Sequence, residues 1–379
     1  MSCCKKSSAY EEEEEYEEEG SEDDEDASDP RVEALSQNGL RLDQIDVLEL
    51  LTKNSKYLSR LTDAKKPKGS GHASCIEQCG KAASDEWIKK LSMALQSNTY
   101  LTELSFGRGH QLSETGMQTL TDALGASSAL NKLALTFGTP GIRAAGCEAM
   151  SDWLGKNSQL TILDLTSNDI GDAGVTAIGK ALASGVTIVK TLMLTTNNIG
   201  PQGGIALADV LSRESALTSL TLADNELGDD GVTSIAEALK TNTTLYALML
   251  DSNRIKSAGA IAIANSLKVN ASLTRLSFES HTLLHESSQF NDIGDDGTHA
   301  FADMLKTNKS LRFLNLNDAG THAESVRALA TAIEESNETL LSCKTAPNMD
   351  PMVESSCKRN MVSHRAGKKW LRRSTTHTS

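Results

Sequence analysis

The residue types that do chemistry in proteins gather at a few places in this 379-residue chain, and their spacing argues against metal binding. His72, Cys75 and Cys79 lie close together, but a C-x-x-x-C pair without a second pair does not supply the ligands of a structural zinc site. His281 and His285 are four residues apart, and nothing around them favours a helix that would align their imidazoles. We therefore predict a linker at the first place and a surface loop at the second.

The run from Gly174 to Lys180 has the G-x-x-x-x-G-K form of a phosphate-binding loop. Ala181 stands where the magnesium-binding Ser or Thr of that loop belongs, and the run lies within a predicted helix. No Ser-His-Asp or Cys-His set is suggested at any recurring spacing. These observations predict that the protein is not an enzyme and that it uses neither a cofactor nor a metal.

Three residues near the N-terminus are candidates for covalent modification. Cys3 and Cys4 precede two lysines, a setting typical of S-acylation, which would add contact with a membrane. Two unmodified thiols are the alternative, since the acids that follow would be repelled by an anionic membrane. Ser21 precedes an acidic run and resembles the target of an acid-directed kinase.

Charge is distributed very unevenly along the chain. The formal net charge is −14, and residues 10–29 alone carry 14 acidic side chains and no basic one. Residues 355–379 carry seven basic side chains and no acid, so with Lys5 and Lys6 counted, the body over residues 30–354 has a charge of −9. An acidic body argues against nucleic acid as a partner, because phosphate would be repelled.

The composition also limits the compartment and the class of protein. No apolar run approaches the length of about 18 residues that suggests a membrane span, and no secretory signal is recognisable at the N-terminus. Seven cysteines in a chain of this kind indicate reduced thiols rather than a disulfide framework. We expect a cytoplasmic protein, peripheral at a membrane only if Cys3 and Cys4 are acylated.

A repeat dominates the middle of the chain. The pattern L-x-x-L-x-L recurs in steps of 28 to 30 residues, with a single longer step of 38. It starts at Leu101, Leu130, Leu160, Val189, Leu217, Leu245, Leu273 and Leu311, with a fragment at Leu340. In the central units an Asn follows the last leucine by three residues, at Asn168, Asn197, Asn225 and Asn253. The alternating leucines predict a short strand, and pairs of aliphatic residues spaced four apart later in the unit predict an amphipathic helix. The Asn lies in the turn between the two in each unit.

The chain contains four N-x-[ST] sequences, and all fall at one position of the repeat, after the helix. They begin at Asn242, Asn270, Asn308 and Asn337. A structural role shared by successive units explains this regularity, whereas glycosylation of an intracellular chain does not.

The unit resembles the ribonuclease-inhibitor-like class of leucine-rich repeats, whose pattern is L-x-x-L-x-L-x-x-N-x-[IL]-G-x-x-G followed by a helix. The resemblance covers about residues 101–345. Gly109, Gly138 and Ala319 replace the Asn in outer units, as suits capping units whose outer faces support no neighbour. The resemblance implies an α/β solenoid of horseshoe shape, with a parallel sheet on the concave side and helices on the convex side.

The expected organisation has four parts. Residues 1–30 form a disordered acidic arm, and residues 31–100 form capping helices and a linker with a degenerate first repeat near Leu58 and Leu61. Residues 101–345 carry about eight repeats and a terminal half unit, with a ten-residue insertion near residues 279–290. Residues 346–379 form a basic tail, disordered like the acidic arm.

The concave face is the predicted binding surface, because the residues between the strand leucines point away from the core. Apolar side chains occur there among small hydroxyls, and carboxylates line the C-terminal half, a pattern that suits a protein partner with a basic surface. The predicted contact residues are Phe137, Ile162, Asp164, Met193, Asp224, Met249, Asp251, Glu279, Phe313 and Asp318.

Three functions are compatible with these observations. The first is a monomeric, non-catalytic scaffold that binds a protein partner on the concave face. The resemblance also allows a regulator of a small GTPase, since activators of the nuclear-transport GTPase Ran combine such repeats with an acidic tail. A third function is binding to the pointed end of actin filaments, since tropomodulin also ends in such repeats.

Overall fold

The computed structural model describes residues 60–62, 85–96, 98–99, 101–107, 112–125, 129–138, 140–213, 215–280, 290–345 and 353–363. The acidic arm therefore lies outside the described residues, together with the expected capping helices before residue 60 and the tail beyond residue 363. The same holds for Cys3, Cys4, Ser21, the group around His72 and the two histidines of the insertion.

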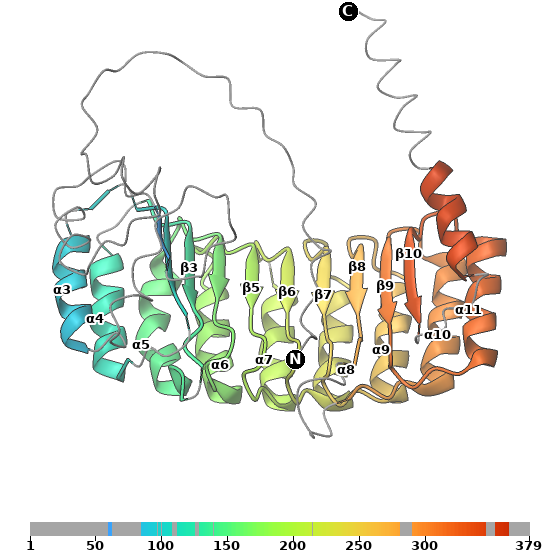
Figure 1. The fold of residues 1–379 in the computed structure, drawn as a ribbon, viewed down its shortest axis with the longest axis horizontal. Coiled ribbons are helices and arrows are strands. Elements are labelled where there is room, and N and C mark those ends of the chain that lie inside the picture. Colours follow the sequence, from blue (N-terminus) through green and yellow to red (C-terminus); the bar gives the residue numbers. More distant parts are fainter. Residues whose placement is uncertain are drawn as a thin grey trace, which may run out of the picture.

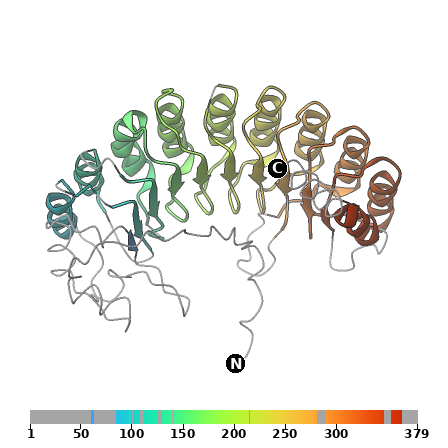
Figure 2. The ribbon, with the colours of Figure 1, turned by 90° about the horizontal axis from the view of Figure 1, so that it is seen from above.

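The described residues form one curved solenoid. Ten parallel strands follow one another in sequence order in a single sheet, and a helix lies between each strand and the next. Figure 1 shows the strands side by side in front of the helices, and Figure 2 shows the arc, with helices on the outer side and strands on the inner side. The predicted horseshoe, with its sheet on the concave face, is confirmed.

Strands and helices alternate along the chain. The strands are β1 (Arg60–Thr62), β2 (Glu103–Phe106), β3 (Lys132–Leu135), β4 (Ile162–Asp164), β5 (Thr191–Met193), β6 (Ser219–Thr221), β7 (Ala247–Met249), β8 (Arg275–Ser277), β9 (Phe313–Leu316) and β10 (Ser342–Thr345). The helices are α3 (Asp85–Leu95), α4 (Glu114–Leu124), α5 (Arg143–Lys156), α6 (Gly171–Leu182), α7 (Pro201–Leu211), α8 (Gly228–Leu239), α9 (Ser257–Leu267), α10 (Gly294–Thr307) and α11 (Ala323–Ser336). A further helix covers residues 353–363.

The core lies between the sheet and the helices. Leu220 and Leu248, in the middle of β6 and β7, are neighbours in register and are fully buried. Alternation in a three-residue strand points its central side chain to one layer and the outer two to the other. The strand phase predicted from the leucine pattern is therefore correct.

Buried asparagines link each turn to the next. Asn225 donates from Nδ2 to the carbonyl of Leu194 in the preceding unit at 2.9 Å, and its Oδ1 accepts from the backbone amides of Asn197 and Ile199 at 3.0 Å each. Asn168, Asn197, Asn253 and Asn291 have the same position and are likewise buried. Such a ladder satisfies backbone groups that no strand pairing reaches, which would be costly to bury unpaired.

A second asparagine ladder runs along the turns between helix and strand. Asn270 Oδ1 accepts from the amide of Leu273 at 2.9 Å, and its Nδ2 donates to the carbonyls of Leu239 and Asn242 at 2.8 and 2.9 Å. The four asparagines of the N-x-[ST] sequences all occupy this ladder and are at most 7% exposed. Their structural role at one repeat position is thus clear.

Helix α6 is linked to α7 by an aspartate. Asp172 Oδ1 accepts from the amides of Gly200 and Gly203, at 2.7 and 2.8 Å, so that it caps the N-terminus of the neighbouring helix. Asp229 caps α9 in the same way. A negative charge at a helix N-terminus also interacts favourably with the helix dipole.

The C-terminal end of the repeats differs from the prediction. The basic tail was expected to begin at residue 346, but the helix over residues 353–363 packs against the last unit. Val353 and Cys357 are buried there, and Asn360 Nδ2 donates to the carbonyls of Asn337 and Leu340 at 2.9 Å each. Asn360 thus satisfies carbonyls at the end of the ladder, so this helix closes the apolar edge that a further repeat would otherwise cover.

Hydrogen bonds define the base of the insertion expected near residues 279–290. Ser280 still belongs to the regular unit, because its Oγ donates to the carbonyl of Asn291 at 3.1 Å and accepts from the amide of Asn291 at 3.0 Å. The extra residues therefore lie between Ser280 and Asn291. Asn291 rejoins the buried ladder, with its Nδ2 donating to the carbonyl of Leu250 at 2.8 Å.

Several non-glycine residues beside the ladder have a left-handed backbone. Ser167, Thr196, Asp224, Ser252 and Asp318 have φ between 49° and 60°. This conformation places Cβ close to the carbonyl oxygen and costs about 1–2 kcal/mol for residues other than glycine. The turn geometry is thus maintained against a local penalty by the bonds of the ladder.

We predict that Asn225→Ala lowers the free energy of unfolding by about 3 kcal/mol or more, because it leaves buried carbonyl and amide groups unpaired at roughly 1–3 kcal/mol each. The control is Asn265→Ala on the exposed surface of α9, which we expect to change stability by less than about 0.5 kcal/mol. Urea melts measure both. Equal losses would show that the ladder adds no more stability than a surface asparagine.

We predict that Thr196→Gly stabilises the chain by about 0.5–1 kcal/mol, because glycine removes the left-handed penalty at φ 56° and loses only part of the gain to its unfolded-state entropy. The neighbouring Thr195→Gly lacks that gain and should be destabilising. Paired thermal melts test the difference, and a loss of stability at both positions would contradict the strain.

Candidate functional site

The concave face is built from three rows of side chains that cross the strands. The first row is Ile162, Thr191, Ser219, Ala247, Arg275, Phe313 and Ser342, which are partners in register. The second row is Asp164, Met193, Thr221, Met249, Ser277, Asn315 and Lys344. The third row, just past the strand ends, includes Thr195, Ala223, Asp251, Glu279 and Asn317, joined by backbone bonds of the residues that follow.

One predicted contact residue does not lie on this face. Phe137 is only 2% exposed and packs against Phe106, with 6.2 Å between the ring centroids. In this unit the left-handed residue is Gly138 itself, at φ 80°, whereas in later units the left-handed residue precedes the ladder asparagine. The side chain of Phe137 consequently turns into the core. Phe137 is withdrawn from the candidate site.

Four of the predicted residues line one hollow at the C-terminal end of the face. Its volume is about 420 Å³, and the residues of β7 to β10 and of the adjoining turns form its wall. Met249, Asp251, Glu279 and Phe313 are the four predicted residues, and Arg275, Ser277, Asn315, Ser342 and Lys344 join them, with Leu276 and Leu314. We call this feature the C-terminal hollow.

The carboxylates of the C-terminal hollow are held in place by hydrogen bonds. Asp251 is nearly buried, and its Oδ1 accepts from the amide of Glu279 at 2.7 Å and from the hydroxyl of Ser277. Glu279 accepts at Oε2 from Asn315 at 2.7 Å and at Oε1 from Asn317 at 3.2 Å. The carboxylates therefore project at fixed positions. The sequence predicted an exposed acidic line, but Asp251 is part of the wall.

An arginine stacks on the aromatic ring of the C-terminal hollow. The guanidinium carbon of Arg275 lies 4.4 Å from the centroid of the Phe313 ring on the adjacent strand. A cation over an aromatic face is attracted by the ring and restricted in its rotation. This arrangement places an apolar plane and a positive charge together at one end of the hollow.

The other predicted contact residues are half-buried on the concave face outside the C-terminal hollow. Ile162, Asp164 and Met193 lie on β4 and β5, and Asp224 and Asp318 lie in the turns beyond β6 and β9. Asp164 Oδ1 accepts from the amide of Thr166 at 2.9 Å, so this carboxylate is also committed to the backbone. The structure thus brings together the C-terminal members of the predicted set and leaves the others dispersed along the face.

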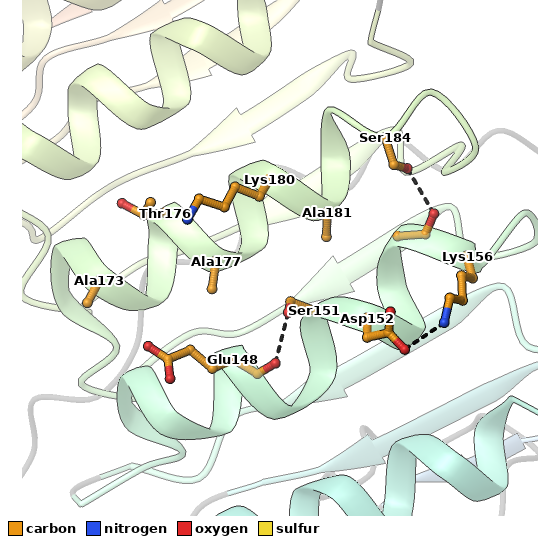
Figure 3. Close-up of a pocket in the computed structure, with 11 residues that line it drawn as sticks. Glu148, Ser151, Asp152, Lys156, Ala173, Thr176, Ala177, Lys180, Ala181 and Ser184 are labelled. Carbon is orange, nitrogen blue, oxygen red and sulfur yellow. Dashed lines mark hydrogen bonds and ion pairs between the residues drawn. The ribbon is translucent and has the colours of Figure 1, made fainter.

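A larger groove, of about 710 Å³, lies on the convex side between α5 and α6 (Figure 3). Its polar groups are largely bonded to one another: Ser184 donates to the carbonyl of Gly155 at 2.8 Å, and Lys156 pairs with Asp152 at 2.7 Å. Small side chains of α6 such as Ala177 form much of its lining, without an aromatic residue to anchor a ligand. The C-terminal hollow is therefore the better candidate site.

Figure 3 also resolves the apparent phosphate-binding loop. The run from Gly174 to Lys180 is continuous helix, α6, with Lys180 on its outer surface beside Thr176. A Cβ on Gly174 would lie 2.9 Å from Ile170 Cβ, so this glycine allows close packing of the turn on the helix. The resemblance of residues 174–180 to a phosphate-binding loop is therefore explained by the packing of a repeat helix.

No group of three or more His, Cys, Asp or Glu within the described ranges is placed to hold a metal ion. The described cysteines do not have the features of nucleophiles either: Cys147, Cys343 and Cys357 are buried. Burial raises the pKa of Cys147 to about 12, with a further contribution from Glu148. Within the same ranges no helix has the length and apolar character needed to cross a bilayer.

Arg275 lines the C-terminal hollow but was not among the contact residues predicted from the sequence. Its position on the strand predicts exposure on the concave face, as for the predicted contact residues. The stacking partner Phe313 lies 38 residues further on, across the insertion, so the pair depends on the register of two strands. Aligning the units at their central leucines, Leu276 and Leu314, would have placed the two side by side.

Comparison with known proteins supports the repeat assignment. The family model described as "Leucine Rich repeat" matches residues 156–179, 187–208, 216–236 and 241–264. The chain is 32% identical over 133 residues to the mouse "NACHT, LRR and PYD domains-containing protein 14", covering 35% of this chain and 13% of that protein. It is 30% identical over 135 residues to mouse "Ribonuclease inhibitor", covering 36% of this chain and 29% of that protein. The matched segments thus span less than a third of these relatives.

Solved structures with a similar arrangement were also found. The yeast complex of Rad7 and Elc1 gives a TM-score of 0.40 at 16% identity, covering 85% of this chain and 84% of that chain. The actin-binding site 2 of leiomodin-1 gives a TM-score of 0.32 at 18% identity, covering 59% of this chain and 95% of that chain. At these identities the likeness concerns the fold alone.

We predict that thiol reagents at pH 8 do not modify Cys147, Cys343 or Cys357 in the native chain. Burial raises the pKa of Cys357 to about 11, against the smaller opposing effects of the Cys343 amide and Arg359, and burial also raises the pKa of Cys343 well above its usual value. At pH 8 the reactive thiolate is then about a thousandth or less of Cys147 and of Cys357. Mass spectrometry of alkylated peptides tests this, with denatured chain as the control, and rapid native labelling would contradict it.

Proposed function

Because the chain is a leucine-rich repeat protein of the ribonuclease-inhibitor-like class, we propose that it is a non-catalytic scaffold that binds a protein partner on its concave face. The C-terminal hollow is the centre of the proposed interface. Its chemistry supports binding rather than turnover, because the polar groups are fixed by hydrogen bonds and the described thiols are buried. Relatives of similar sequence include ribonuclease inhibitor, whose name describes binding to a protein.

The observation that carries the proposal is the set of apolar anchors beside fixed polar groups in the C-terminal hollow. Met249 and Phe313 remain half-exposed on a face where small polar side chains surround them. Interfaces concentrate their binding energy in aromatic, Met and Arg side chains at a hollow with polar neighbours. Arg275 on the Phe313 ring completes such a group.

The proposal includes several finer statements. The half-buried carboxylates of Asp224, Glu279 and Asp318 support contact with basic groups of the partner. We place the protein in the cytoplasm as a monomer, with membrane contact only through acylation of Cys3 and Cys4. Regulation of a small GTPase and binding to the pointed end of actin filaments stay predictions from the sequence resemblance.

We predict that the double variant Met249→Asp, Phe313→Asp loses its partner proteins. Two charges in the C-terminal hollow would face apolar partner side chains, and removal of hot-spot residues typically weakens binding by 2 kcal/mol or more, about 30-fold. The measurement is quantitative affinity capture from native lysate with the full chain as bait. Proteins that depend on the hollow should be at least about tenfold depleted with the variant.

The matched control is Ile205→Asp, which places the same charge on an exposed apolar position of convex helix α7. Its capture profile should match that of the unmodified chain. If both variants lose the same proteins, or neither loses any, the concave C-terminal hollow is not the binding site.

A further inference from the structure

The charged groups of the C-terminal hollow are sorted along the direction of the strands. Arg275 begins β8 and belongs to the first row, whereas Glu279 lies four residues later, in the third row. At about 3.3 Å per residue the two positions are ~13 Å apart. Met249 lies between them in the second row, and Lys344 borders the hollow in that row on β10.

The third-row end of the hollow is acidic and fixed. Asp251 and Glu279 each accept hydrogen bonds from neighbours, so both carboxylates are held in position. Within the described ranges the Glu279 carboxylate accepts from two Asn side chains, and no Lys or Arg forms an ion pair with it. A carboxylate with two bonded acceptor sites keeps further lone pairs for a partner, since each carboxylate has about four.

The first-row end is basic. The guanidinium carbon of Arg275 lies over the Phe313 ring, and the group carries five N–H donors. Among the residues that the structure describes, no carboxylate or carbonyl accepts from its side chain. An arginine oriented by stacking presents a fork of donors that fits a carboxylate with two parallel hydrogen bonds.

We propose that the C-terminal hollow binds an extended segment of a protein partner that carries an acidic residue and a basic residue about four positions apart, with an apolar residue between them. The acidic residue pairs with Arg275, the apolar side chain packs on Met249 and Phe313, and the basic residue pairs with Glu279. An extended chain spans ~13 Å in about four residues. This proposal rests on the proposed function and adds an acidic group to the basic one expected of the partner.

The size of the hollow favours an extended segment over a helix. A volume of 420 Å³ is at the small end of the range of ligand sites. A helix with its side chains is about 10–12 Å across and covers 13 Å in eight or nine residues, which requires a wider groove. An extended segment instead places alternate side chains toward the face, so that residues i, i+2 and i+4 reach the three rows in turn.

The test uses a displayed library of random linear twelve-residue peptides and the full chain as the target. The unmodified chain should select peptides with an acid and a base four positions apart around an apolar residue. Arg275→Glu should select a second base in place of the acid, and Glu279→Lys should select a second acid in place of the base. The control is Thr191→Glu, at the same first-row position three strands away from Arg275, which should leave the selection unchanged.

A selected peptide then gives the affinity measurement. Arg275→Glu should raise its Kd at least about tenfold, since it replaces a charge-assisted pair by a repulsion, and reversal of the peptide's acid to Lys should restore binding. If each variant melts at the same temperature as the unmodified chain, a loss of folding does not explain its weaker binding.

Selection of the same peptides by Arg275→Glu, or peptides without the acid, would overturn the charge arrangement while leaving the hollow as a binding site. Peptides that bind the Met249→Asp, Phe313→Asp variant equally well, or the absence of any binder, would overturn the site and the proposed function with it.

Discussion

The hydrogen bonds of the buried asparagines are the interaction on which the whole structure depends. Most strands are three residues long, so strand pairing alone leaves the following turns without partners. The side chains of Asn197, Asn225 and their equivalents donate to a carbonyl of the preceding unit and accept from backbone amides of that same unit, and this pattern repeats at nearly constant spacing. Each unit thereby completes its neighbour, which is why a single unit would not be stable alone. The same bonds hold left-handed residues such as Thr196 in a conformation that they disfavour.

Fixed register along the solenoid is what creates a site from dispersed residues. Because Leu276 pairs with Leu314 across the insertion, Arg275 is placed beside Phe313 although the sequence separates them. The insertion changes the length of one unit and not its register, since Ser280 and Asn291 close its base with two hydrogen bonds. The buried Ala247 in the first row adds no bulk on the side of Arg275 away from Phe313. The C-terminal hollow thus arises because side chains of different size, the small Ala247 and the large Arg275 and Phe313, occupy equivalent positions on adjacent strands.

Much of the fold follows from the sequence because each unit repeats the same physical requirement. The leucine positions identify the buried side of every strand, and the helix spacing of four identifies the buried side of every helix. The prediction was wrong where a unit departs from the repeat: Phe137 turns inward because Gly138 takes the left-handed position. The helix over residues 353–363 was missed since it belongs to no repeat, and its buried side becomes apparent only against the exposed end of the last unit. Within the site, alternation identified Met249 and Phe313, but only the geometry shows that the carboxylate of Asp251 is part of the wall.

Fixing a carboxylate has consequences for how a surface recognises a partner. Glu279 is anchored by two amide donors from Asn315 and Asn317, so binding does not have to restrict its rotamers again. The side chain is thus ordered before the partner binds, so binding loses less conformational entropy. The same holds for Arg275 on the Phe313 ring. Preorganised groups of opposite charge at a fixed separation select partners by spacing, because a segment with the wrong spacing satisfies one end and places an unpaired charge at the other. A rigid parallel sheet, which cannot adjust the distance between its rows, is well suited to this form of discrimination.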